Sequence, residues 1–323
     1  MLPMHPLRFR PILRQYLWGG RRFESSLGKS LPPGDDFAES WEISDHGADQ
    51  SIVGFGPLAG TTLHELVAVH GRELLGRHHP QPGFPLLLKF LDGQQTLSLQ
   101  VHPNDAQAAR LDPPDAGKTE AWFVIEALPG SKICAGLKPG VGREQLLAAI
   151  RQGEVEPCLN VFAASPGDCV FLPAGTIHAL GAGLLVAEIQ QSSDTTYRLF
   201  DWNRVGPDGR RRPLRTEEGL DVVDFARGPV MPQRPQATSR PQVSRLVDCD
   251  KFVWDRLNFD SPLSIGGDDR CHMLTVLQGA AQIAGDPGDS PLPRGGTALL
   301  PASLGQVTLS PHGQAVMLDA YLP

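Results

Sequence analysis

The stretch from Gly167 to His178 constrains the fold more than any other part of the sequence, because it sets a turn, a strand, a bend and a histidine within twelve residues. Gly167 allows the chain to turn into a strand, and Pro173 and Gly175 bend the chain where that strand ends. The histidine then returns toward the mouth of a barrel. We expect His178 to act at that mouth, the alternative being an ordinary hairpin that holds a hydrogen-bonded histidine.

Turn residues are frequent throughout the chain, which favours a fold made of short strands. The 35 glycines and 30 prolines make up 65 of the 323 residues and suit tight turns better than helical bundles. Apolar runs bounded by Gly or Pro predict strands at 38–44, 86–90, 96–102, 121–126, 168–172 and 184–191. Helical spacing of apolar residues predicts two helices, at 61–76 and 143–151. We therefore expect a mainly β fold with a small helical part.

The chain is about twice as long as a typical domain, and a proline-rich stretch divides it. Residues 227–243 contain four prolines and little apolar periodicity, which predicts a linker. The segments 273–279 and 296–302 resemble 167–174, so the part after the linker is interpreted as a diverged copy of the part before it. The predicted domains are 1–226, with helical insertions at about 61–78 and 140–160, and 244–323.

Charge and cysteine content exclude several classes of protein. A net charge of −7 and a pI near 5.8 provide no field for a nucleic-acid backbone. The five cysteines are odd in number and form no CxxC pair, which argues against a disulfide framework or a zinc ribbon and favours the cytoplasm. The N-terminus lacks an apolar signal region, and no run of eighteen apolar residues occurs. We expect neither secretion by that route nor a membrane span.

The strand around Gln100 separates apolar from polar side chains. Because side chains alternate along a strand, one face is apolar and the other is a row of potential metal ligands. The two sets are Leu97, Leu99 and Val101, and Ser98, Gln100 and His102. A strand with one face in solvent explains the same pattern equally well, so the assignment depends on its context.

That context is the 167–178 stretch, which fits GxxxxxPxGxxH, the second motif of the cupin barrels. The first cupin motif usually offers two histidines one residue apart and a carboxylate soon after. Here Gln100 stands in the place of the first histidine, and the candidate carboxylate, Glu120, is farther away because residues 103–118 intervene.

Three motifs in this order resemble type I phosphomannose isomerase, a family of the cupin superfamily. They are Gln100-x-His102, residues 117–122 and Pro-x-Gly-x-x-His. The resemblance implies cupin-type β-barrels in two jelly-roll-like units. It extends along the first 205 residues, through segments 16–20, 38–42, 85–89, 98–105, 118–122, 175–178, 193–198 and 201–202.

The resemblance implies one metal ion per chain, normally Zn²⁺. Its ligands would be Gln100, His102, Glu120 and His178. One amide oxygen, two imidazoles and one carboxylate form a mixed set that suits Zn²⁺ and also accepts other divalent ions.

The implied reaction interconverts mannose 6-phosphate and fructose 6-phosphate through a cis-enediol, so the site must also hold a phosphate. Arg198 matches the arginine that family members place beside the reacting carbons, and Arg204 falls where the family has a basic phosphate contact. The run 210–212 follows a turn and is interpreted as a solvated loop. The matching segments also supply three expected substrate contacts, Ser98, Trp41 and Glu42.

Three further residues are expected to act in the reaction. Asp194 matches an acidic residue proposed in relatives to help open the sugar ring, although the Ser-Asp-Thr sequence could equally form a turn. Lys89 and Lys118 lie in motif segments of a chain that has only six lysines. An amine can lose its proton when it is desolvated or lies near a cation, which an arginine practically cannot. The alternative is that each lysine pairs with a carboxylate.

Two other functions use the same barrel: another metallocupin enzyme, such as an oxygenase, or a non-catalytic cupin that binds a sugar phosphate. The expected partner is a small sugar phosphate, and the sequence leaves monomer and homodimer open. The second unit is expected to lack a metal, because residues 303–305 bring no histidine to the place that His178 occupies after its bend. Metal binding by His272 or His312 would contradict this expectation.

Overall fold

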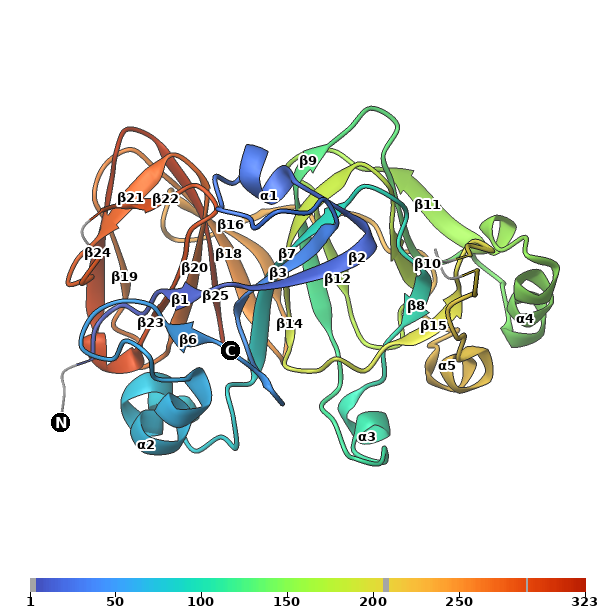
Figure 1. The fold of residues 1–323 in the computed structure, drawn as a ribbon, viewed down its shortest axis with the longest axis horizontal. Helices are drawn as coiled ribbons and strands as arrows, with labels where there is room; N and C mark the ends of the chain where they lie inside the picture. The colour runs from blue at the N-terminus through green and yellow to red at the C-terminus, as the bar shows by residue number, and fades with distance from the viewer. Residues whose placement is uncertain (1–3, 206–208, 289) are drawn as a thin grey trace.

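The computed structural model describes residues 4–205, 209–288 and 290–323. Its strands form two units of two facing sheets each, with five, six, six and four strands in order across the molecule (Figure 1). Neighbouring strands in these sheets pair in antiparallel fashion. The mainly β fold of two cupin-type barrels expected from the sequence is confirmed.

The first unit holds the predicted strands. Its six-stranded sheet has the order β12 (Cys169–Leu172), β9 (Glu120–Ala127), β14 (Leu184–Gln191), β7 (Leu86–Gly93), β3 (Phe37–Ile43) and β2 (Ile12–Gly20). Its five-stranded sheet has the order β11 (Leu159–Ala163), β10 (Lys132–Leu137), β13 (His178–Leu180), β8 (Leu99–Val101) and β15 (Tyr197–Phe200).

The second unit has the same two-sheet arrangement. Its six-stranded sheet has the order β16 (Gln236–Ala237), β17 (Val243–Asp248), β18 (Val253–Phe259), β25 (Ala315–Tyr321), β20 (His272–Gln278) and β23 (Thr297–Leu300). The facing sheet has the order β19 (Leu263–Gly266), β24 (Gln306–Pro311), β21 (Ala280–Ile283) and β22 (Leu292–Pro293). Two short pairs join β1 (Phe9–Arg10) with β6 (Ile52–Val53) and β4 (Asp45–His46) with β5 (Asp49–Gln50).

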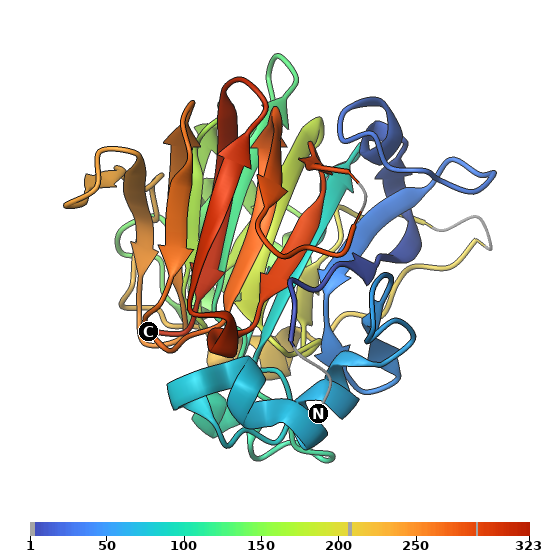
Figure 2. The same ribbon diagram turned by 90° about the vertical axis from the view of Figure 1, so that its left-hand side faces the viewer.

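The helices lie outside the sheets. They are α1 (Arg22–Ser25), α2 (Leu63–Leu75), α3 (Asp105–Ala108), α4 (Arg143–Gln152) and α5 (Thr216–Val222), with 3₁₀ turns at Gly76–His78, Glu156–Cys158 and Ala302–Leu304. Both expected helices are present, and Thr62 caps the N-terminus of α2, where its hydroxyl accepts from the Glu65 N–H in a capping box. Figure 2 shows α2 beneath the lower ends of the strands of the second unit.

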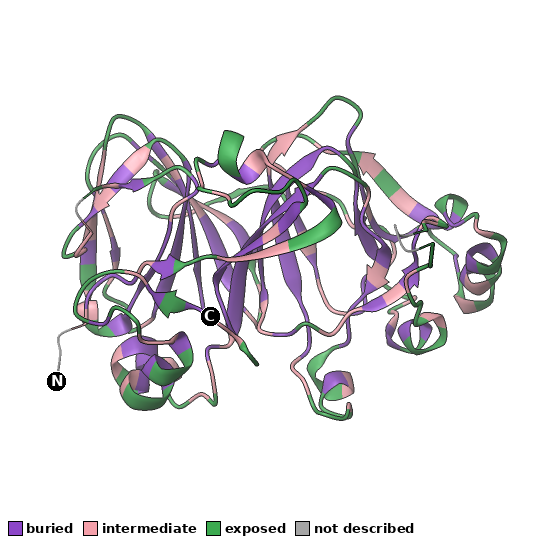
Figure 3. Cartoon of the chain, in the orientation of Figure 1, coloured by how far each residue is buried: buried purple, intermediate pink, exposed green. Residues whose placement is uncertain are grey.

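The two six-stranded sheets pack against each other and bury both faces of their central strands. Every residue of β7 is buried (Figure 3). Leu88 and Phe90 point into the core between the units, where Phe123 meets Trp254 edge to face with ring centroids 6.4 Å apart. The alternate side chain, Lys89, therefore points into the first unit. A lysine in such a strand has to find a partner there.

The strand around Gln100 is shorter than predicted. β8 begins at Leu99, and Leu99 and Val101 pack beneath α4 and α5 on the outer face of the five-stranded sheet. Leu97 instead packs with Trp18 and Trp122 inside the first unit. The expectation that Leu97 shares a face with Leu99 is wrong, because Leu97 precedes the regular strand and alternation does not extend to it.

The proline-rich stretch 227–243 runs along the first unit in its first part, and Gln236–Ala237 then form β16 at the edge of the second unit. The Gln233 N–H donates to the carbonyl of Cys169 at 2.6 Å, and Val230 packs against the cluster inside that unit. At the other end of the chain, Leu7 exchanges two backbone hydrogen bonds with Leu299 of the second unit, each 2.8 Å long. The division at 227–243 stays a prediction about domains.

Candidate active site

Two histidines and a carboxylate meet inside the first unit, because their strands are neighbours. His178 opens β13 and lies directly opposite Gln100 of β8. Glu120 opens β9 in the facing sheet. Its Oε1 lies 3.1 Å from Nε2 of His178, and its Oε2 lies 3.4 Å from Nε2 of His102. One ligand atom from each of these three residues lies within 4.8 Å of the others.

Backbone carbonyls fix the orientation of both imidazoles. Nδ1 of His102 donates to the carbonyl of Thr195 at 3.0 Å, and Nδ1 of His178 donates to that of Thr176 at 2.9 Å. With the proton on Nδ1, each Nε2 presents a lone pair to Glu120. Burial, together with the nearby Lys118 ammonium, lowers the pKa of His102 to about 3. His102 is therefore neutral near pH 7, as a metal ligand must be.

The Glu120 carboxylate is buried without a hydrogen-bond donor among the described residues. Burial alone raises the pKa of this carboxyl, but the Lys118 ammonium and then the two imidazoles lower it well below its usual range. A buried charge of this kind is costly unless it is paired or bound to a metal.

Gln100 adjoins these three residues, since its amide nitrogen lies 3.2 Å from Nε2 of His178. A half-turn of the amide would present its oxygen instead. These four residues thus fit a divalent cation.

The two expected lysines have different carboxylate partners. Nζ of Lys118 lies 3.3 Å from Nε2 of His102 and 3.4 Å from Oε2 of Glu120. Nζ of Lys89 lies 3.1 Å from Glu188 and 3.5 Å from Glu39. Burial alone would lower the pKa of Lys89, but Glu188 and Glu39 raise it overall. For Lys89 the geometry therefore favours the carboxylate pair over a neutral amine.

A cavity of about 310 Å³ opens beside these groups. The sequence-predicted residues that line it are Ser98, Gln100, Lys89, Lys118, Asp194 and Arg198. Arg198 lies opposite Gln100 in the pairing of β15 with β8, and its Nε donates to Oγ of Ser98 at 3.4 Å.

Three charged residues of this cavity were missed by sequence reasoning: Glu39, Glu188 and Arg212. Glu188 could have been found, because it is the only charged residue in the otherwise apolar and amide-bearing β14 and must be buried with that strand. Its Oε2 accepts from the Trp122 indole at 2.8 Å. Arg212 belongs to the run that was interpreted as a solvated loop.

Two expected substrate contacts on β3 lie outside the cavity lining. Nε1 of Trp41 donates to Glu39 at 2.6 Å, so the indole supports a residue that does line the cavity. Glu42 points away, where it accepts from Ser40 at 2.5 Å, Lys29 at 2.9 Å and Thr297 at 3.2 Å. The expected substrate contact by Glu42 is corrected to a buried structural ion pair, because alternation puts it on the opposite face of β3.

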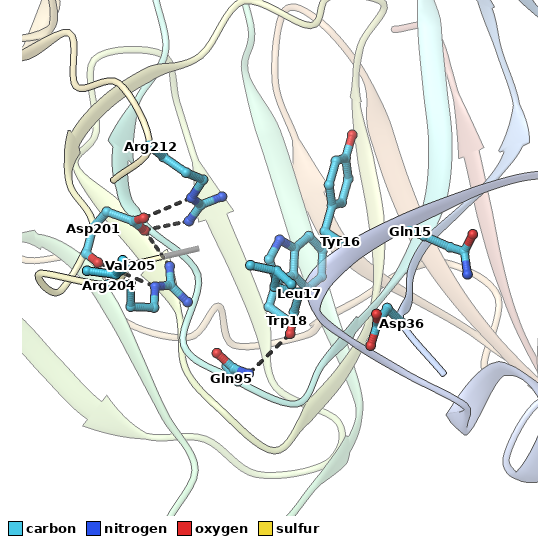
Figure 4. A pocket seen from close by; sticks show the side chains of 10 residues that line it. All are labelled: Gln15, Tyr16, Leu17, Trp18, Asp36, Gln95, Asp201, Arg204, Val205 and Arg212. Carbon is cyan, nitrogen blue, oxygen red and sulfur yellow. Dashed lines mark hydrogen bonds and ion pairs between the residues drawn. The ribbon is translucent and has the colours of Figure 1, made fainter. Parts of the chain in front are cut away.

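Arg204, the expected phosphate contact, also lies outside the cavity. It lines a neighbouring pocket of about 760 Å³ (Figure 4), which shares Tyr16, Trp18 and Arg212 with the cavity. Its guanidinium donates to the carboxylate and carbonyl of Asp201 and, at 2.7 Å, to the carbonyl of Thr96.

The histidines of the second unit are arranged differently. Nδ1 of His272 lies 2.9 Å from Asp319, and Nε2 lies 3.1 Å from Asp268. Among the described residues, the only cluster of three potential metal ligands is the one around Glu120. The expectation that the second unit is metal-free stays a prediction, favoured by the engagement of both ring nitrogens. None of the described helices combines the length and apolar character needed to cross a bilayer.

Comparison with known proteins connects this site to one family. A sequence model of phosphomannose isomerase type I, catalytic domain, matches residues 7–120. Mannose-6-phosphate isomerase ManA of Bacillus subtilis (strain 168) is 32% identical over 317 residues, which are 97% of this chain and 98% of that relative. Mannose-6-phosphate isomerase of Streptococcus mutans serotype c is 38% identical over 222 residues, 69% of each chain. The crystal structure of mannose 6-phosphate isomerase from Bacillus subtilis matches with a TM-score of 0.89 and 28% identity, over 98% of this chain and 99% of that one.

Proposed function

The chain belongs to the type I phosphomannose isomerase family and interconverts mannose 6-phosphate and fructose 6-phosphate, and we propose that it does so in the cavity beside Glu120, through a cis-enediol and with one bound metal ion. The observation that carries the proposal is the Glu120 carboxylate, which is buried between the Nε2 atoms of two histidines and accepts no hydrogen bond from the described residues. A cation at this position would satisfy all three groups at once.

We assign four ligands, Gln100, His102, Glu120 and His178, and zinc as the metal. The mixed oxygen and nitrogen set supports zinc, and the Nδ1 contacts of both histidines support Nε2 as the binding atom. When bound, a divalent cation supplies positive charge to the sugar oxygens that become negative in the enediolate.

Arg198 and Lys89 add positive charge to the same region. Arg198 lies next to Gln100 across the β8–β15 pair, which supports a place beside the reacting carbons. A preorganised guanidinium there stabilises the charge that develops on the sugar oxygens. Lys89, held charged by Glu188 and Glu39, contributes to the same field.

The remaining assignments concern proton transfer and substrate contacts. Lys118 lies beside two of the proposed metal ligands, 3.3 Å from Nε2 of His102 and 3.4 Å from Oε2 of Glu120, so we assign it proton transfer between C2 and C1. Asp194, which is exposed and lines the cavity, is assigned to ring opening. Ser98 contacts the sugar from the cavity wall.

We place the enzyme in the cytoplasm, with a small sugar phosphate as its partner. The five cysteines are free, which supports a reducing compartment.

A coupled assay that detects fructose 6-phosphate formed from mannose 6-phosphate tests the function. We expect activity in the metal-loaded protein, its loss after chelation, its return with Zn²⁺, and about one metal per chain by elemental analysis. Absence of turnover by the metal-loaded protein would contradict the proposal.

The same assay tests Arg198. Replacement by alanine should lower kcat by about 10²- to 10³-fold, the effect of removing one preorganised donor to an oxyanion, with a smaller change in KM. Metal content and melting temperature are measured in parallel. An unchanged kcat at normal metal content would reject the catalytic role.

A further inference from the structure

Two guanidinium groups share one carboxylate at the edge of the cavity, and a third guanidinium group lies near them. Asp201 accepts from Arg204 and from Arg212, whose Nε and Nη2 lie 2.8 and 2.5 Å from its two carboxylate oxygens. The third, Arg198, donates to Ser98 and, at 3.0 Å, to the carbonyl of Pro213. Burial, and then Arg212, lower the pKa of Arg198, as expected for neighbouring like charges. The cluster therefore carries more positive than negative charge.

Arg212 is the member of this cluster that faces both the cavity and the neighbouring pocket. It lines the cavity beside Glu120 and also the adjoining pocket, whereas Arg204 lines the pocket and lies outside the cavity. In Figure 4 Asp201 holds one edge of the Arg212 guanidinium, and the remaining nitrogen points away from Asp201, toward the side of the pocket where Tyr16 lies. That nitrogen, Nη1, has no hydrogen-bond acceptor among the described residues and is available to a ligand.

The strand register sets the direction in which a substrate would lie. His178, Gln100 and Arg198 occupy paired positions on three neighbouring strands, β13, β8 and β15. Adjacent strands lie about 4.8 Å apart, so this row leads stepwise from the proposed metal ligands to Arg198. Arg212 belongs to the loop after β15 and adjoins this end of the row, because Arg198 donates to the carbonyl of the next residue, Pro213, and both arginines line the cavity. In a 6-phosphorylated hexose, the reacting carbons C1 and C2 and the phosphate are at opposite ends of the molecule.

We propose that Arg212 binds the phosphate of the substrate and that Asp201 is a positioning residue that holds its guanidinium toward the cavity. This inference rests on the proposed function, because it takes the sugar phosphate as the ligand. It assigns the phosphate to Arg212 where the sequence had indicated Arg204, and it leaves Arg198 to the reacting end.

Charge and geometry both fit this ligand. A phosphate monoester carries about −1.5 to −2 charges near neutral pH. Three guanidinium groups against the single Asp201 carboxylate leave an excess of positive charge that a phosphate dianion would balance. A planar guanidinium clamped along one edge loses little freedom when its other edge binds an oxyanion.

The test compares Arg212→Gln with Arg204→Gln, since both arginines pair with Asp201 and only Arg212 lines the cavity. For Arg212→Gln we expect the KM for mannose 6-phosphate to rise about 10- to 100-fold, the range for losing one hydrogen bond to a charged group, with kcat changed much less. The Kd of inorganic phosphate, measured by calorimetry on the metal-loaded protein, should rise in parallel. Arg204→Gln should change either value by less than about twofold.

Equal values of KM and phosphate Kd in Arg212→Gln and the wild type would overturn the proposal, as would a larger effect of Arg204→Gln. If Arg212→Gln fails to fold, Arg212→Lys is used instead. It keeps a positive charge beside Asp201 but loses the two-nitrogen contact of the guanidinium, so it should weaken phosphate binding at an unchanged melting temperature. The phosphate titration needs no turnover. If the isomerase assay shows no turnover while phosphate binding still depends on Arg212, the proposed function is rejected and the assignment of Arg212 to phosphate binding stands.

Discussion

Each of the two units carries charged side chains on the inner face of its six-stranded sheet, on a central strand and the strand beside it. In the first unit, Glu188 of β14 lies opposite Lys89 of β7, and the carboxylate of Glu120 lies beyond them on β9. In the second unit, Asp319 of β25 binds His272 of β20. The two clusters have similar places in similar sheets, yet they differ in whether their polar atoms have partners.

The difference separates a reactive site from a structural one. Glu120 is buried with no hydrogen-bond donor among the described residues, and its neighbouring histidines turn a lone pair toward it. His272 instead has a carboxylate at each ring nitrogen. Buried polar groups are costly unless they are satisfied, so the first cluster is incomplete without a ligand and the second is complete as it stands.

Packing around the clusters differs in the same way. Apolar side chains such as Leu274, Leu309 and Met317 fill the space between the sheets of the second unit. In the first unit, a cavity lined by several charged groups remains beside the cluster. The same fold thus encloses a packed apolar core in the second unit and a cavity in the first, and the side chains on the inner faces determine the difference.

The largest effect that tests this comparison is on metal binding. Replacing His178 by alanine removes one of the proposed ligands and should reduce metal affinity by more than about 10²-fold, because altering even an outer-shell partner costs 10- to 100-fold. Competition with a chelating dye measures the affinity directly. His272→Asn is the matched control in the second unit and should bind metal as the wild type does.

Normal metal content in His178→Ala would contradict the ligand assignment. A loss of metal in His272→Asn, at a temperature where that variant is folded, would contradict the proposed contrast between the units.

The next effect is on stability and concerns the boundary between the units. Glu42 is buried with Lys29 at 2.9 Å and Thr297 of the second unit at 3.2 Å. Glu42→Gln leaves the partly buried Lys29 without its counter-ion and should lower the free energy of unfolding by about 2–3 kcal/mol, with kcat and KM unchanged in the folded protein. Urea denaturation and steady-state kinetics measure the two quantities.

Glu39→Gln is the matched variant, since Glu39 lies on the same strand and faces the cavity. It should change the kinetics more than the stability. A large change in KM for Glu42→Gln with normal stability would restore Glu42 as a substrate contact.

Local motifs predicted the group of three potential metal ligands because its residues belong to short, regular segments. The bend after Pro173 delivers His178, and alternation puts Gln100 on the inner side of β8, next to His178 on β13. Glu120 follows an insertion, yet it still opens a strand of the facing sheet. The family resemblance rests on these short motifs, so the sequence was enough to predict that His102, Glu120 and His178 lie together.

The errors arose where the sequence does not encode which face is functional. Both faces of β3 are buried, so alternation separates Glu39 from Glu42 without showing which one meets the cavity. The proposal of Arg212 in place of Arg204 depends on a return of the loop to Asp201, a contact between residues eleven positions apart that periodicity does not predict.

The smallest effect is a pH dependence that belongs to the second unit. Burial alone would lower the pKa of His272, but Asp319 and Asp268 raise it overall to about 10, against about 6.5 in an unfolded chain. Of the other groups that face it, Tyr321 stays neutral because burial raises its pKa, and Arg270 stays charged. Between pH 6.5 and 10 the folded protein keeps a proton that the unfolded chain releases, so the stabilisation by His272 is fully present below pH 6.5 and is lost as the pH rises toward 10.

We expect the wild type to exceed His272→Gln in the free energy of unfolding by about 2 kcal/mol at pH 6, and the difference to shrink toward zero by pH 10. Parallel urea titrations of the metal-loaded proteins across this range measure it. A difference that stays constant with pH would mean that His272 stabilises the unit by packing alone, and the contrast between a charged His272 here and a neutral His102 in the first unit would not hold.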